Sequence, residues 1–168
     1  MTANSTSGLA LRSLFWALFF PGLLAGYVPW RWFGLRHVVL DARQPLHWIG
    51  GIAIAAGAVL LALCILDFAR RGRGTLSPAD PPRHLVVQGL YRHVRNPMYL
   101  SVSLVLLGEV LLVRSGALLA YWAAWFTAVN LFVLGYEEPA LRRQFGAGYA
   151  EYAAQVPRWV PRLRPWRR

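Results

Sequence analysis

Four long apolar runs follow one another along the chain, separated by polar and basic stretches. They cover residues 14–30, 48–68, 97–113 and 117–136. A helix that crosses a membrane needs about 20 predominantly apolar residues, and roughly 17 is near the lower limit. The pattern therefore predicts an all-α integral membrane bundle of about four transmembrane helices, folded as a single domain of residues 1–168.

Only three residues, Arg114 to Gly116, separate the last two runs, which predicts a tight antiparallel helical hairpin. Residues 1–84 are expected to form the two N-terminal spans and a cytosolic loop, and residues 85–168 the hairpin and a cytosolic tail. Small residues crowd the first half of the second run, between Gly50 and Ala58. This composition is typical of membrane helices that approach each other closely.

The segment after the last apolar run has a different character. Apolar side chains recur at helical spacing over residues 140–154, with Gly146 and Gly148 interrupting the pattern. This predicts two short helices that lie at the membrane interface. Beyond them, prolines at positions 157 and 161 predict an extended end.

The chain is strongly basic, with a net charge of +11, and all 18 basic residues are Arg. We reject nucleic acid as a partner, because the Arg residues cluster beside the apolar runs, as in the positive-inside pattern. With both termini cytosolic, fourteen Arg fall on the cytosolic side and four on the far side. A bacterial cytoplasmic membrane is the expected location. No metal site is expected, because Cys64 is the single cysteine and neither His84 nor His93 has a partner at ligand spacing.

A cationic and hydrogen-bonding cluster, Arg92, His93, Arg95 and Asn96, stands at the entrance of the third run. One interpretation is a basic flank that anchors the helix against anionic lipid. The other is a binding site for a carboxylate or phosphate, since the planar guanidinium makes two parallel charge-assisted hydrogen bonds. The sequence Asn-Pro at the helix start adds a cap and free backbone N–H groups, which favour an anion.

Two adjacent carboxylates, Glu137 and Glu138, follow the last apolar run. They either pair with Arg142 and Arg143, or accept hydrogen bonds from ligand hydroxyl groups, because charges near membrane depth usually serve a function. A third carboxylate, Glu109, falls inside an apolar run and is expected to face the bundle interior, as a structural pair or a protonated donor.

Together these segments resemble the isoprenylcysteine carboxyl methyltransferase family, which belongs with the phospholipid methyltransferases. One part reads Gly-x-Tyr-Arg-x-x-Arg-Asn-Pro-x-Tyr from Gly89 to Tyr99. The other runs from Glu-Glu-Pro at Glu137 to Val-Pro-Arg at Arg158. The resemblance covers residues 85–162. It implies a membrane-embedded methyltransferase that uses S-adenosylmethionine, releases S-adenosylhomocysteine and acts on a hydrophobic or lipid-borne acceptor, either an isoprenylcysteine carboxylate or a phospholipid amine.

The resemblance also implies a cofactor site on the cytosolic side. Its binding residues are Tyr91, Arg92, Asn96, Pro97, Tyr99, Glu137, Glu138, Tyr149 and Tyr152, to which we add His93 from the cationic cluster. Arg95 is expected to orient a carboxylate acceptor, and Glu138 to act as base toward an amine. The family's His before Pro is Asn96 here, and a Gly expected after the Tyr is Ser101.

Two other functions fit parts of the sequence. A non-catalytic membrane protein would use the basic surface to bind anionic lipid or a partner, and only the number of Arg residues would then matter. A membrane reductase that uses a nicotinamide cofactor is the third, since some sterol reductases resemble this family in their C-terminal half. The short chain argues against the reductase.

Overall fold

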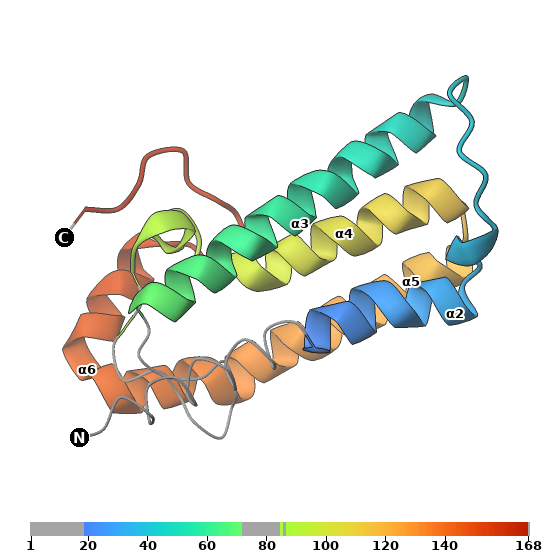
Figure 1. Cartoon of the computed structure of the whole chain (residues 1–168). Coiled ribbons are helices and arrows are strands. Elements are labelled where there is room, and N and C mark those ends of the chain that lie inside the picture. Colours follow the sequence, from blue (N-terminus) through green and yellow to red (C-terminus); the bar gives the residue numbers. More distant parts are fainter. Residues whose placement is uncertain (1–18, 72–84, 86, 168) are drawn as a thin grey trace, which may run out of the picture.

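The computed structural model describes residues 19–71, 85 and 87–167 (Figure 1), and all regular structure within them is helical. A helix covers residues 19–22 and continues as a π-helix. The elements that follow are η1 (Leu23–Tyr27), α2 (Val28–Trp32), η2 (Leu35–His37), α3 (Pro45–Arg71), η3 (Gly89–Arg92), α4 (Pro97–Val113), α5 (Gly116–Phe132), η4 (Val133–Glu137) and α6 (Glu138–Gln155). The all-α prediction is confirmed for this part of the chain.

The predicted hairpin is confirmed by α4 and α5. Pro97 occupies the first turn of α4, where its missing N–H costs nothing. Arg114 ends the helix in the left-handed conformation, with φ 55°, and its backbone N–H reaches the Val110 carbonyl. Ser115 then caps α5, because its hydroxyl accepts a hydrogen bond from the Leu118 N–H at 3.3 Å.

The composition predicted that the last apolar helix ends at the two glutamates, but the helix continues past them. It runs from α5 through the π-helix η4 into α6 (Figure 1), and its apolar part ends at Tyr136. The π-helix explains how a helix continues into Pro139. A proline ring clashes with the carbonyl four residues earlier in an α-helix, and the wider π turn relieves this. The same arrangement occurs at η1, which directly precedes the turn that contains Pro29.

The break predicted in the tail helix lies at Gly146, whose φ of 51° and ψ of −125° are not helical. Between Val156 and Arg167 the chain carries no helix, in agreement with the predicted extended end.

Two helical stretches among the described residues, Pro45–Asp67 of α3 and Gly116–Gln155, are long and apolar enough to cross a membrane, and α4 is a shorter apolar helix. The structure describes the first predicted span only from residue 19, so four spans stay a prediction. Glu109 in α4 is 4% exposed, as expected for a carboxylate that faces the interior.

The helices α3 and α4 lie side by side (Figure 1), and glycines allow their backbones to meet. A Cβ at Gly50 would lie 2.7 Å from the Gly108 carbonyl oxygen, and one at Gly57 would lie 2.8 Å from the Ser101 carbonyl oxygen. The second position is where Ser101 replaces the glycine of the family pattern. Its buried hydroxyl bonds the Pro97 carbonyl at 2.8 Å, so the contact with α3 is kept.

This contact predicts opposite results for two neighbouring glycines. Gly50→Ala forces the backbones apart and lowers the free energy of unfolding by about 1–3 kcal/mol. Gly51→Ala leaves it unchanged or raises it, because a Cβ there meets nothing within 4 Å and alanine favours the helix by about 1 kcal/mol. Thermal unfolding of both variants in detergent measures the difference. Equal stability of the two variants would contradict this packing.

Candidate active site

The cationic segment before α4 and the glutamate pair at the junction of η4 and α6 meet at one end of the bundle. Arg95 Nη1 lies 2.9 Å from Glu138 Oε1, and the Tyr99 hydroxyl donates to Glu137 Oε2 at 3.1 Å. The side chains of Arg95 and Glu138 are 11% and 8% exposed. The structure therefore brings together residues 38 to 43 positions apart that the sequence predicted for one site.

A second guanidinium, that of Arg158, joins them from the extended tail. Its Nε donates to Glu138 Oε1 at 2.7 Å and its Nη2 to Oε2 at 2.9 Å, a two-pronged pairing of guanidinium and carboxylate. The expected ion pairs with Arg142 and Arg143 are not found among the described residues. The Arg142 guanidinium lies over the ring of Tyr149, 5.7 Å from its centroid, where its charge still acts on Glu138. Glu138 thus links the start of α4 to the tail.

The tail lies along the segment that precedes α4, and backbone hydrogen bonds join the two. Hydrogen bonds of this kind need no particular side chain, so they leave no mark in the sequence. They join the Arg95 N–H to the Pro157 carbonyl (2.9 Å), the Arg162 N–H to the His93 carbonyl (2.9 Å) and the Trp166 N–H to the Arg92 carbonyl (2.9 Å). A side chain adds a fourth hydrogen bond, because the Asn96 Nδ2 donates to the Arg158 carbonyl (3.2 Å).

Besides Asn96, two predicted binding residues contact this tail through their side chains. The Arg92 Nε donates to the Trp166 carbonyl at 2.5 Å, and His93 Nδ1 lies 2.8 Å from the Arg162 carbonyl. Because that oxygen only accepts, the imidazole proton is on Nδ1. In this conformation Arg92 and His93 hold the tail in place.

The predicted tyrosines pack against one another beneath the tail. The Tyr152 hydroxyl donates to the Tyr91 carbonyl at 2.7 Å, and the rings of Tyr149 and Tyr152 meet edge to face at 6.2 Å. Both are buried with Val156 and Trp166 in one apolar cluster. The cluster packs α6 against the tail, and the hydrogen bond from Tyr152 to Tyr91 joins α6 to η3.

Two polar groups distinguish the site from a closed structural network. The Arg95 Nε–H is buried and has no hydrogen-bond partner among the described residues, although its Nη1 is paired. A buried donor without a partner costs free energy, and a bound carboxylate would satisfy it. Glu137 is the second group, since its carboxylate accepts a hydrogen bond from a neutral hydroxyl, that of Tyr99, and not from a guanidinium among the described residues.

The two glutamates differ in their proton affinity. Burial and the charge of Glu138 raise the pKa of Glu137, against the hydrogen bond from Tyr99. Burial also disfavours ionised Glu138, but the hydrogen bonds from Arg158 and the charge of Arg95 outweigh it and hold the pKa of Glu138 below its ordinary value. Glu137 is therefore the better proton acceptor of the two.

The lowered pKa of Glu138 predicts acid sensitivity. A group whose pKa is lower in the folded state contributes stability above its unfolded pKa, near 4.5, and loses it as the pH falls further. The free energy of unfolding should therefore decrease on acidification below about pH 4.5, and Glu138→Gln should flatten this part of the profile. Unfolding in detergent at a series of pH values measures both. An unchanged slope in the variant would show that Glu138 is not the group responsible.

The sequence did not single out Arg158 or Trp159 as site residues. Arg158 stood at the end of the family pattern, and that position was the available indication. Trp159 packs on Phe126 at 5.0 Å and on Tyr99 at 6.5 Å between ring centroids, and its indole donates to Asn130 Oδ1 at 2.9 Å. It extends the site toward α5.

Pro97, also predicted as a binding residue, is buried at the start of α4.

Comparison with known proteins gives one match. The model of a family described as phospholipid methyltransferase matches residues 46–148, which span α3, α4, α5 and most of α6. No curated protein and no solved structure matches the chain. The match contains both the cationic segment and the glutamate pair, and the tail lies beyond it.

Proposed function

Because the chain belongs to the phospholipid methyltransferase family, we propose that it is an integral membrane methyltransferase that uses S-adenosylmethionine. Its acceptor is hydrophobic or lipid-like, and S-adenosylhomocysteine is the second product. The observation that carries the proposal is the juxtaposition of an unpaired, buried Arg95 Nε–H with Glu137 under a tail held by Arg158.

The donors and acceptors of the site match the polar groups of S-adenosylmethionine. The Arg95 Nε–H would bind the carboxylate of the methionine part, since guanidinium–carboxylate hydrogen bonds are the strong ones. Glu137 would accept hydrogen bonds from the ribose hydroxyls, next to the hydroxyl of Tyr99. When bound, the sulfonium supplies a methyl group that a nucleophile attacks in line, and the electron pair of the broken C–S bond stays on sulfur.

The residues around this position suit a lipid-borne acceptor. The rings of Tyr99, Trp159, Phe126 and Trp122 form a continuous row, with successive centroids 6.5, 5.0 and 5.9 Å apart. The row leads from Glu137 along the hairpin toward the apolar part of α5. Aromatic surfaces bind both apolar chains and cationic ammonium groups. Methyl transfer depends on holding acceptor and methyl group in line, which such a wall provides.

The acceptor determines whether a base is needed. A carboxylate acceptor is already a nucleophile and needs no base. Arg95, which the sequence suggested for orienting such an acceptor, would bind the cofactor carboxylate instead. An amine acceptor must lose a proton, and Glu137 is better suited to take it than Glu138, whose carboxylate is paired with two guanidinium groups. This assigns Glu137 the role of base that the sequence suggested for Glu138.

The Arg distribution supports a cytosolic site in a bacterial cytoplasmic membrane, with both termini on the same side. S-adenosylmethionine is then available directly from the cytosol, and the acceptor enters laterally from the bilayer between the helices.

Transfer of a labelled methyl group from S-adenosylmethionine to a lipid extract tests the proposal. The wild-type protein should label a lipid-soluble product, and Glu137→Gln should lower the rate about a hundredfold through loss of its hydrogen bonds and its proton acceptor. The exposed Glu151 of α6 provides the matched control, since Glu151→Gln removes the same charge outside the site. Failure of the folded wild-type protein to label any lipid, or full activity of Glu137→Gln, would contradict the proposal.

A further inference from the structure

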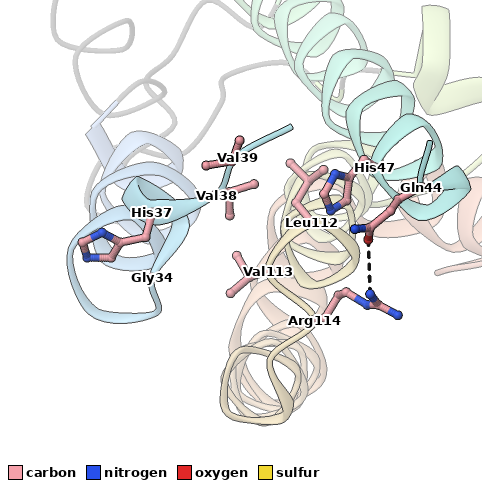
Figure 2. Close-up of a pocket in the computed structure, with 9 residues that line it drawn as sticks. All are labelled: Gly34, His37, Val38, Val39, Gln44, His47, Leu112, Val113 and Arg114. Atoms are coloured by element: carbon pink, nitrogen blue, oxygen red, sulfur yellow. Dashed lines mark hydrogen bonds between the residues drawn. The ribbon is translucent and has the colours of Figure 1, made fainter. Parts of the chain in front are cut away.

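A second polar site lies at the opposite end of α4. Arg95 and Asn96 precede this helix and Arg114 follows it, and the 17 residues between them span about 25 Å. At that far end a depression of about 360 Å³ is lined by Gly34, His37, Val38, Val39, Gln44, His47, Leu112, Val113 and Arg114 (Figure 2). It is separate from the candidate active site.

On its polar side, hydrogen bonds within the protein occupy the side-chain acceptors of Gln44, Asp41 and His47. N–H groups of Arg114 and His47 stay available. Arg114 Nη1 donates to Gln44 Oε1 at 3.2 Å, and Gln44 Nε2 donates to Asp41 Oδ2 at 3.3 Å. His47 Nδ1 accepts the Asp41 N–H at 2.9 Å, so the proton of the neutral imidazole is on Nε2. The guanidinium of Arg114 and the Nε2–H of His47 therefore offer hydrogen-bond donors beside the depression.

The other side is apolar. Figure 2 shows Val38 and Val39 facing Leu112 and Val113, with His47, Gln44 and Arg114 along one edge, while the ring of His37 points away. Val39 and the neighbouring Leu40 are 83% and 71% exposed. Exposed aliphatic side chains at a helix end are suited to the boundary between headgroups and acyl chains.

We propose that this depression binds one phospholipid of the far leaflet. Its phosphate accepts hydrogen bonds from Arg114 and His47, and the glycerol and upper acyl chain lie against Val38, Val39 and Leu112. Phosphate suits the site because it offers only acceptors, which complements a rim of donors with a fixed positive charge. The apolar half of the site distinguishes a lipid from free phosphate.

Native mass spectrometry of the full chain in detergent, with added dioleoylphosphatidylglycerol, tests the proposal. The wild-type protein should retain one lipid molecule. Gln44→Glu should weaken its retention about tenfold, because the new carboxylate neutralises Arg114 while preserving their contact. Arg114→Asn should do the same, and asparagine tolerates the left-handed backbone at this position. Arg43→Gln is the control, because Arg43 is exposed on the same loop and does not line the depression.

Weaker retention in both variants and unchanged retention in Arg43→Gln, with wild-type circular dichroism throughout, supports the site. Equal loss in Arg43→Gln would show a general basic surface and overturn it. Absence of a stoichiometric lipid on the wild-type protein would also overturn it. Inorganic phosphate that displaces the lipid, or stabilises the protein equally against heat, would assign the site to the free anion instead.

Discussion

We expect Arg95→Lys to weaken the binding of S-adenosylhomocysteine roughly tenfold to a hundredfold while the protein stays folded. Lysine keeps the positive charge beside Glu138 but removes the Nε–H that lacks a partner. A hydrogen bond to a charged group contributes about 1.5–3 kcal/mol, which corresponds to this range of affinity. Lysine also lacks the planar fork that binds a carboxylate in two places. Calorimetric titration of the purified variant measures the loss.

Arg143→Lys is the matched control for this substitution. Arg143 is exposed on α6, so the same chemical change there should leave the affinity unchanged. If Arg95→Lys bound the ligand as tightly as the wild-type protein, the unpaired Nε–H would have no part in recognition. The carboxylate of the ligand would then have to be bound elsewhere.

The second large effect concerns stability. Glu138→Gln should lower the free energy of unfolding by about 3 kcal/mol, because removing one partner from a buried ion pair leaves the others uncompensated. Here two guanidinium groups, of Arg95 and Arg158, lose their shared carboxylate. Since Arg158 is 30% exposed, water compensates it in part, and most of the loss comes from Arg95. Denaturant unfolding in mixed micelles measures the change.

A double variant separates this network from a general effect of charge. The double variant Glu138→Gln, Arg158→Gln should lose less free energy of unfolding than the two single variants together. Once Glu138→Gln has removed the carboxylate, Arg158→Gln has no ion pair left to break. Glu151→Gln should change stability by less than about 0.5 kcal/mol, as an exposed substitution does. Strict additivity would show that Glu138 and Arg158 do not interact in solution.

The start of α4 and the reversal that follows it could be predicted from particular residues. Pro97 sets the start of α4 because proline is favoured in the first turn, and Arg114-Ser115-Gly116 is too short for anything but a tight reversal. The pairing of the cationic segment with the glutamates also followed from the sequence, because topology placed both at the same membrane surface.

The continuous helix through Glu137 was not predicted, and the reason is physical. Charges and Pro139 normally mark the end of an apolar helix, but η4 widens the turn so that the proline is accommodated. The course of the tail along the segment before α4 could not be predicted from the sequence either. It depends on backbone groups such as the Arg95 N–H and the Pro157 carbonyl, which every residue type possesses. The role of Arg158 depends on that course.

The most direct test is calorimetric titration of the detergent-purified protein with S-adenosylhomocysteine. The account predicts saturable binding of one ligand per chain, lost when Glu137 and Glu138 are both replaced by glutamine and retained in Glu151→Gln. Absence of binding by well-folded wild-type protein at millimolar ligand would contradict the central claim that the Arg95–Glu137–Glu138 cluster is a cofactor site.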